Sequence, residues 1–203
     1  MTSLPRREFL RTSLAAGTTL WAAGGTPLLS PSWGKDTAAR PASEREVLPV
    51  AAITTEYRIN SHADVILSKI LEGFDQLGGP GPRLKLVSLV TDQVPGRDIS
   101  RAMAQKHGFQ ICDTIEQALT LGTDKLAVAG VLSVCEHGDY PFDERTGQHK
   151  YPRRRFFDGI VDVYEKYGEV RPLFNDKHLS WNWKDARHMY DRAKDLKVPF
   201  LAG

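Results

Sequence analysis

Side chains that commonly bind metal ions gather in one short part of the chain. Cys135, Glu136, His137 and Asp139 fall within five residues, and His149 lies further along the chain. Such groups hold zinc or other transition metals, which can activate water for hydrolysis. Their spacing matches no standard zinc pattern, so we expect no dedicated metal site, and a metal-assisted hydrolase is the weakest function considered. The insert at residues 140–152 is equally typical of a lid or a partner-binding surface.

Hydrophobic periodicity predicts alternating strands and helices from about residue 47 to the end. The expected strands are short apolar runs, at residues 50–53, 84–90, 109–112, 126–134, 170–174 and 198–202. The expected helices have one apolar face each, at residues 61–74, 99–107, 114–121, 156–167 and 181–196. This order predicts an α/β fold with a doubly wound, mainly parallel six-stranded Rossmann-like sheet. Ligands bind such sheets beyond the carboxyl ends of the strands, where the strand order reverses.

Side-chain patterns predict which faces of these helices are buried. In the last helix the expected apolar stripe consists of Trp183, Ala186, Tyr190, Ala193 and Leu196. The cluster Arg153-Arg154-Arg155 is interpreted as the solvated start of a helix instead of a phosphate-binding patch. Three histidines on predicted helices are expected to be surface or packing residues: His62, His107 and His188.

The two cysteines, Cys112 and Cys135, are expected to be free thiols. With the common strand order 3-2-1-4-5-6, they lie at strands that are separated by two others. At about 4.8 Å per strand spacing, the separation is about 14 Å, which a disulfide cannot bridge.

The N-terminal residues resemble an export signal. Pro5-Arg6-Arg7-Glu8-Phe9-Leu10-Arg11 precedes a modestly apolar run at residues 12–23, and this order is similar to that of a twin-arginine signal. The apolar run is too short and too rich in Gly and Thr for a stable membrane span. We therefore expect residues 1–40 to be a signal peptide and linker, with the twin-arginine export machinery as a partner. The resemblance implies a periplasmic or otherwise extracytoplasmic protein that folds before export.

The charge of the expected mature domain gives no indication of a nucleic-acid partner. The whole chain has a formal net charge of +2, with 27 basic and 25 acidic residues. Residues 1–40 contain five of the basic and two of the acidic residues, which leaves 22 against 23 in the remainder. The apparent basicity belongs to the leader, and the domain is close to neutral.

Three segments near the C-terminus point to a known family: Asn175-Asp176-Lys177-His178-Leu179, Lys184-Asp185-Ala186-Arg187 and Val198-Pro199-Phe200-Leu201-Ala202-Gly203. They resemble the Glu-Lys-Pro segment, the following helix and the sixth strand of the Gfo/Idh/MocA oxidoreductases. Asp92, Arg97 and the helix that ends before Gly108 are similar to the second strand and next helix of that family. The resemblance covers about residues 47–203, which we expect to form one Rossmann-like domain. In the family, a further domain with the catalytic histidine follows the sixth strand.

The resemblance implies roles for individual residues. Lys177 matches the family lysine that assists proton transfer, although its neighbours are Asp and His in place of Glu and Pro. Ser133 ends the fourth strand, and His137 falls near a family position on the nicotinamide side of the cleft. Asp92 matches the acidic residue that binds a ribose hydroxyl in NAD enzymes, although an Asp in this place is as often a turn former.

The turn after the first strand departs from the pattern that NAD(P) binding requires. A dinucleotide fold has the motif G-x-G-x-x-G there, which lets the backbone approach the pyrophosphate. This chain has Thr54-Thr55-Glu56-Tyr57-Arg58-Ile59, without any of the three glycines. If a cofactor binds, Thr54, Thr55, Tyr57 and Arg58 surround it, and Arg58 could pair with phosphate. Glu56 places a negative charge where the diphosphate would lie.

Two functions follow from these observations. The first is an exported Gfo/Idh/MocA-like oxidoreductase that acts on a sugar or polyol with NAD(P). The second is a non-catalytic relative that has lost dinucleotide binding and binds a small molecule or a protein instead. The absence of the glycine motif favours the non-catalytic relative, and the family resemblance favours the oxidoreductase.

Overall fold

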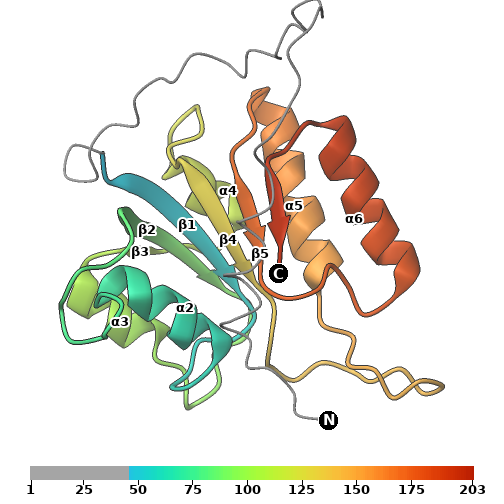
Figure 1. Ribbon diagram of the computed structural model, residues 1–203, viewed down its shortest axis with the longest axis horizontal. Helices are drawn as coiled ribbons and strands as arrows, with labels where there is room; N and C mark the ends of the chain where they lie inside the picture. The colour runs from blue at the N-terminus through green and yellow to red at the C-terminus, as the bar shows by residue number, and fades with distance from the viewer. Residues whose placement is uncertain (1–45) are drawn as a thin grey trace, which may run out of the picture. The chain divides into compact units, whose positions relative to one another are not determined.

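The computed structural model describes residues 46–203, so the expected signal peptide and linker lie outside the described part. Six parallel strands form one sheet in the order β3-β2-β1-β4-β5-β6 (Figure 1). The strands are β1 (Leu48–Thr54), β2 (Leu84–Thr91), β3 (Gln110–Ile111), β4 (Gly130–Val134), β5 (Leu173–Asn175) and β6 (Phe200–Ala202). The helices are α2 (His62–Leu71), α3 (Ser100–His107), α4 (Ile115–Thr120), α5 (Arg153–Tyr167) and α6 (Trp183–Asp195). The predicted α/β class, parallel sheet and strand order are confirmed.

Two hydrophobic clusters cover opposite faces of the sheet. Successive side chains of β1 alternate between them, because side chains of a strand point to alternate sides. Val50 and Ala52 belong to the cluster that contains α2 and α3 side chains, such as Leu67. Ala51 and Ile53 belong to the larger cluster, which contains side chains of α4, α5 and α6. In this three-layer arrangement, helices cover the two faces of the sheet, and loops lie at the carboxyl ends of the strands.

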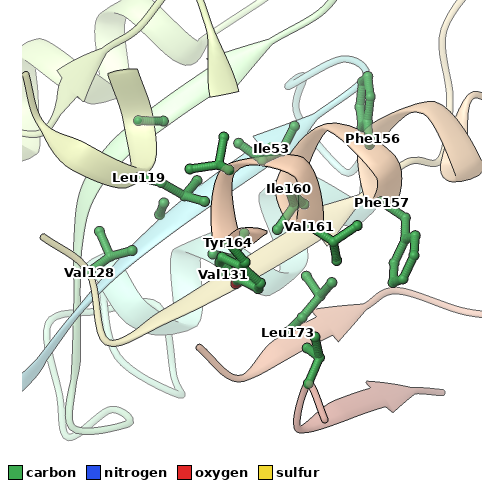
Figure 2. Close-up of a cluster of buried hydrophobic side chains, with 14 of the residues drawn as sticks. Ile53, Leu119, Val128, Val131, Phe156, Phe157, Ile160, Val161, Tyr164 and Leu173 are labelled. Atoms are coloured by element: carbon green, nitrogen blue, oxygen red, sulfur yellow. The ribbon is translucent and has the colours of Figure 1, made fainter. Parts of the chain in front are cut away.

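Helix α5 supplies much of the larger cluster (Figure 2). Its buried apolar residues recur at helical spacing on one side: Phe156, Phe157, Ile160, Val161, Val163 and Tyr164. The helix ends at Gly168, whose φ of 67° is a left-handed conformation that glycine adopts without steric cost. It is 15 residues long, and no helix within residues 46–203 has the length and hydrophobicity needed to cross a bilayer.

Helix α2 is shorter than the sequence pattern predicts. It begins after Ser61, whose hydroxyl accepts a hydrogen bond from the backbone N–H of Asp64 at 3.2 Å. It ends at Leu71, and Phe74 is 60% exposed, so the prediction that Phe74 belongs to the buried face was wrong. Gly73 has a φ of 83°, and a Cβ at this position would lie 2.3 Å from the carbonyl oxygen of Gly79. The glycine lets the chain turn away before Phe74 can reach the sheet.

Helix α6 uses a different face from the one predicted. Trp183 and Tyr190 are 78% and 53% exposed, whereas Met189 and Ala193 are buried. The predicted aromatic stripe was therefore wrong in these two members, because α6 buries Met189 and Ala193 in the larger cluster and pairs polar side chains with α5. The prediction for β4 was also too long, since residues 126–129 precede the strand and only Gly130–Val134 pair with β1.

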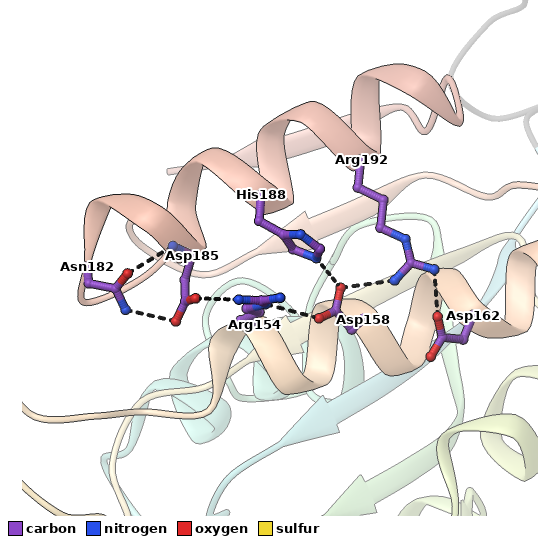
Figure 3. Close-up of polar contacts among 7 residues, drawn as sticks. All are labelled: Arg154, Asp158, Asp162, Asn182, Asp185, His188 and Arg192. Atoms are coloured by element: carbon purple, nitrogen blue, oxygen red, sulfur yellow. Dashed lines mark hydrogen bonds and ion pairs between the residues drawn. The ribbon is translucent and has the colours of Figure 1, made fainter.

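A chain of ion pairs joins α6 to α5 (Figure 3). Arg154 contacts Asp185 at 2.7 Å, and Asp158 accepts from both His188 at 2.7 Å and Arg192 at 3.0 Å. Asn182 is the N-cap of α6, and its side chain accepts a hydrogen bond from the backbone N–H of Asp185 at 2.9 Å. These contacts hold the start of α6 close to the start of α5, beside the carboxyl edge of the sheet.

Both cysteines are free and buried, as expected from the strand order. Cys112 follows the edge strand β3, and Cys135 follows β4, with β2 and β1 between these strands. Burial raises the pKa of the Cys135 thiol to about 12 and also raises the pKa of Cys112. We expect a thiol-specific disulfide reagent at neutral pH to react slowly with the native protein and to titrate two thiols after denaturation without reductant. Fewer than two thiols in the denatured protein would contradict the assignment.

Candidate functional site at the carboxyl edge of the sheet

The loops after β1, β2, β4 and β5 meet where the strand order reverses. The register pairs Thr54 with Thr91 on one side and with Val134 on the other, and it pairs Ser133 with Asn175. The residues that follow these positions therefore share one edge of the sheet. This is the edge at which open α/β sheets bind ligands.

One non-glycine residue in each loop after β1, β4 and β5 has a left-handed backbone conformation: Asn60 with φ 60°, His137 with φ 74° and Lys177 with φ 61°. This conformation is unfavourable for residues with a Cβ atom and persists where surrounding contacts enforce it. Other described residues with positive φ, such as Gln76, lie in turns away from this edge. The backbone thus places three polar side chains at the ligand edge of the sheet.

Protein side chains fill the turn after β1. Glu56 is 1% exposed and pairs with Arg58 at 2.9 Å and with Arg97 at 2.8 Å. Tyr57 is fully buried in the cluster beneath α2, and burial is the main reason why its pKa is raised. The two arginines that could have met a phosphate are therefore engaged by a buried carboxylate.

The two threonines of the turn use their hydroxyl groups to join neighbouring strands. Thr54 Oγ1 donates to the carbonyl oxygen of Val90 at 3.2 Å, and Thr55 Oγ1 donates to that of Glu136 at 2.8 Å. Both residues are fully buried. Thr54 thus joins the ends of β1 and β2, and Thr55 fixes the loops after β1 and β4 relative to each other.

A second carboxylate lies at the start of α2. Asp64 occupies the first turn, where negative charge is favourable, and its Oδ2 accepts from the backbone N–H of Asn60 at 2.8 Å. A helix N-terminus at this place is where a dinucleotide fold binds its diphosphate. The carboxylates of Asp64 and Glu56 thus lie where the phosphates of such a cofactor would need positive charge.

Asp92, the residue matched to the ribose-binding acid, is held by two partners. Arg155 donates to its two carboxylate oxygens at 3.0 and 2.6 Å, and the Tyr140 hydroxyl donates to Oδ2 at 2.6 Å. Burial alone would raise the pKa of Asp92, but the hydrogen bonds from Arg155 and Tyr140 lower it overall. The carboxylate anchors the 140–152 insert to the end of β2.

Ser133, Asp92 and the turn after β1 therefore do not form one open cradle. Ser133 is 1% exposed, and its hydroxyl lies 3.4 Å from the sulfur of Cys135 in the core. The residues in this structure do not fit a dinucleotide bound in the usual way, because the turn has no glycine and contains a buried Glu56.

A histidine that sequence reasoning treated as a packing residue belongs to this edge. His62 Nδ1 lies 2.7 Å from Asp176 Oδ2, and its ring centroid is 5.5 Å from that of His137. The Nδ1 atom of His137 is buried without a hydrogen-bond partner among the described residues. The signal available from the sequence was the position of His62, directly after the N-cap Ser61 and therefore at the carboxyl edge.

Glu136, in the loop after β4, pairs with Arg153 at the start of α5 and with Lys177 in the loop after β5. Arg153 is 1% exposed and donates to Glu136 Oε2, while Lys177 Nζ lies 3.6 Å from Glu136 Oε1. The expectation that the arginine cluster is a solvated helix start was wrong for Arg153, because this side chain turns inward to the carboxylate. Lys177, the lysine matched to the family, lies at this edge and is 41% exposed in its side chain.

The metal-ligand side chains of the 135–149 segment do not come together. Cys135 points into the core, Glu136 pairs with Arg153, and His149 Nε2 donates to the carbonyl oxygen of Tyr140 at 2.6 Å. Within residues 46–203, no three His, Cys, Asp or Glu side chains are grouped so that they could hold a metal ion. The geometry gives no support to the hydrolase hypothesis.

Burial lowers the pKa of His137 below its ordinary value of 6.5, and Arg58 and His62 lower it further. A histidine with a lowered pKa in the folded state stabilises the fold above pH 6.5, and this stabilisation decreases as the pH falls below 6.5. We expect wild-type protein to lose more free energy of unfolding between pH 7 and pH 5 than His137→Gln does. Denaturant unfolding at the two pH values measures this difference, and an NMR titration that placed the His137 pKa above 6.5 would contradict it.

No protein-family model and no curated protein matches the chain. Solved structures do match. One is GenD2 from gentamicin A biosynthesis in complex with NAD, with a TM-score of 0.53 and 16% identity over 81% of this chain and 36% of that chain. Another is a dehydrogenase from Clostridium difficile, with a TM-score of 0.49 and 11% identity over 77% of this chain and 39% of that one. The chain spans little more than a third of the length of either protein.

At this level of identity, the comparison with GenD2 shows the fold. The chain is a Rossmann-like α/β domain, which is the fold that the resemblance to the Gfo/Idh/MocA oxidoreductases implied.

Proposed function

We propose that the chain is an exported domain of the Gfo/Idh/MocA type that binds a sugar or polyol and has lost the usual dinucleotide site. The fold and the Lys177 segment support the family, and the leader at residues 5–23 supports export. The observation that carries the loss of the cofactor is Glu56, which is buried in the turn after β1 and paired with Arg58 and Arg97. If a diphosphate bound these two arginines, the buried carboxylate of Glu56 would lose its partners. A buried charge without partners is strongly destabilising.

The proposed ligand class follows from what remains at the carboxyl edge. His62, His137, Glu136 and Lys177 present hydrogen-bond donors and acceptors there, and the hydroxyl groups of a sugar or polyol can use both kinds of partner. Asp176 Oδ2 lies 2.7 Å from His62 Nδ1 and orients the ring. The other ring nitrogen of His62 can therefore accept a proton from a hydroxyl group of the bound ligand and hold it. Lys177 can orient the same ligand through its ammonium group.

A second candidate is an NAD(P)-dependent oxidoreductase, with this domain as the cofactor-binding part. GenD2, which has a similar fold, was solved in complex with NAD. In that case Arg58 would have to leave Glu56 and bind phosphate, and Asp92 would have to leave Arg155 to bind a ribose hydroxyl.

Titration of the full chain with NADH and NADPH, followed by fluorescence, distinguishes the two candidates. We expect no saturable binding below about 1 mM, which corresponds to less than about 4 kcal/mol of binding free energy. The variant Arg58→Ala serves as a matched test. Under our proposal it should leave the titrations with NADH and NADPH unchanged. If Arg58 holds a phosphate, the variant should weaken the binding of the dinucleotide. Saturable sub-millimolar binding that is lost in Arg58→Ala would establish the oxidoreductase candidate instead.

A further inference from the structure

We propose that two copies of this chain associate through α6, with the two helices antiparallel across a two-fold axis. The surface in contact is the outer face of α6, which consists of four residues spaced as one side of a helix requires: Trp183, Ala186, Arg187 and Tyr190. The inference goes beyond the proposed function and does not depend on it.

The outer face of α6 points away from the rest of the domain. The helix lies at the outer edge of its layer, beside α5 (Figure 1). Three side chains of α6 contact α5: Asp185, His188 and Arg192 (Figure 3). At about 100° per residue, these three lie on the side of the helix opposite to Trp183 and Tyr190. Both aromatic side chains are therefore exposed.

The residue types of the outer face are those that contribute most to protein interfaces. Single exposed aromatic residues are common, but here Trp, Tyr and Arg lie together on one helix side. With Leu179, the outer face lines a hollow of about 250 Å³. The Arg187 guanidinium lies 5.9 Å from the centre of the Tyr190 ring and helps to hold it in place. An aromatic side chain of a second copy can fill this hollow.

Antiparallel packing makes the outer face complementary to itself. Ala186 and Arg187 lie midway between Trp183 and Tyr190 in the sequence. A two-fold axis at this midpoint places Trp183 of each copy opposite Tyr190 of the other, so the same aromatic contact forms twice. The small side chain of Ala186 at the centre lets the two helices approach closely.

Charges beside the outer face favour the same orientation. Lys184 and Asp191 lie on one flank, about 80–100° around the helix from Trp183. In the antiparallel dimer these flanks lie on the same side, and Lys184 of each copy comes within about 3 Å, measured along the helix axis, of Asp191 of the other. Asp191 accepts from Arg187 at 2.6 Å, and its carboxylate has room for a second donor. Parallel packing puts the two flanks on opposite sides and forms no such contact.

The length of α6 limits the strength of this association. The helix has 13 residues and is therefore about 20 Å long. Two helices of this length bury less than the roughly 1,200 Å² of a standard interface, which is typical of reversible association. We expect a dissociation constant of about 10–100 μM for the dimer.

Sedimentation equilibrium of the full chain from about 1 to about 500 μM tests the proposal, because it spans the change from monomer to dimer. Trp183→Ala and Tyr190→Ala should each raise the dissociation constant by about tenfold or more. Both side chains are exposed, so the two variants should keep the fold. Phe74→Ala is the matched control, because it removes an exposed aromatic side chain beside α2 and should leave the dissociation constant unchanged.

Charge reversal tests the orientation of the two helices. Lys184→Glu places two carboxylates opposite each other at both flank contacts, and Asp191→Lys places two ammonium groups there. Each variant alone should therefore associate more weakly than wild type, by about fivefold or more. An equimolar mixture of the two variants should recover dimers, because both flank contacts of the mixed dimer then join opposite charges.

Three results would overturn the inference. The first is a monomer at every concentration. The second is a dimer that is unchanged in both Trp183→Ala and Tyr190→Ala, since another surface would then hold it together. The third is a mixture of Lys184→Glu and Asp191→Lys that associates no better than either variant alone, which excludes the antiparallel order. Circular dichroism of each variant identifies any that fails to fold, and the remaining variants keep the test decisive.

Discussion

Replacing Arg153 with methionine is expected to lower the free energy of unfolding by about 3 kcal/mol. The side chain is 1% exposed and pairs with Glu136, so its removal leaves a carboxylate that is 18% exposed without its main partner. Loss of one partner of a buried ion pair costs about 3–5 kcal/mol. We expect the lower end of this range, because water reaches Glu136 and Lys177 Nζ remains 3.6 Å from it. Urea unfolding at neutral pH measures the change.

The neighbouring Arg155 provides the control for this prediction. It pairs with Asp92 at 2.6 Å, but its side chain is 59% exposed. Exposed ion pairs contribute about 0–1 kcal/mol, so Arg155→Met should destabilise the protein much less than Arg153→Met. Equal effects of the two substitutions would show that Arg153 is not the buried partner described here.

Phe157→Ala is expected to lower the free energy of unfolding by about 3–5 kcal/mol. Phe157 is fully buried on α5, in the cluster that joins this helix to the sheet (Figure 2). Its ring centroid lies 5.2 Å from that of Phe200 on β6. Removing a buried phenyl ring loses its transfer free energy and leaves a cavity. Because β6 is a short edge strand, the substitution should also loosen its pairing with β5. Hydrogen exchange of the β6 amides reports this second effect.

Phe74→Ala is the matched substitution at an exposed site. Phe74 follows α2, and its side chain is 60% exposed. Its backbone makes the local contacts, with its N–H donating to Pro80 at 2.9 Å and its carbonyl oxygen accepting from Lys69 at 2.7 Å. The variant should change the free energy of unfolding by less than about 0.5 kcal/mol. A loss comparable to that of Phe157→Ala would contradict the burial pattern of α2.

The order of the elements could be predicted because it depends on local patterns. At the start of α4, Thr114 and Gln117 form a capping box, and the two residues lie three positions apart in the sequence. Gly108 ends α3 with a φ of 75°, as expected for the residue after a helix. Local hydrogen bonds and backbone preferences of this kind require no knowledge of distant residues.

The faces of the helices were less predictable, because burial depends on what packs against them. The pattern of α6 favoured Trp183 and Tyr190 as core residues, yet both are exposed. The helix instead turns Arg192 and His188 toward Asp158 of α5. Periodicity identifies an apolar stripe on a helix, but it does not show which side chains of the neighbouring helix lie opposite that stripe.

The candidate site was partly visible in the sequence. Lys177 and His137 were both expected at the carboxyl edge, and both lie there with left-handed backbone conformations. His62 and Arg153 were assigned to the surface or to packing. Their partners, Asp176 and Glu136, lie 114 and 17 residues away in the sequence, so no local pattern could connect them.

By itself, the sequence determined that the chain is a parallel α/β domain, that its first turn has no glycine motif, and that its leader resembles an export signal. These properties depend on periodicity, on single residue types and on short motifs. Only the tertiary structure decided what replaces the missing motif. Glu56 is buried between Arg58 and Arg97 because the sheet register and the loop after β2 bring Arg97 back to the end of β1, a contact across 41 residues of sequence.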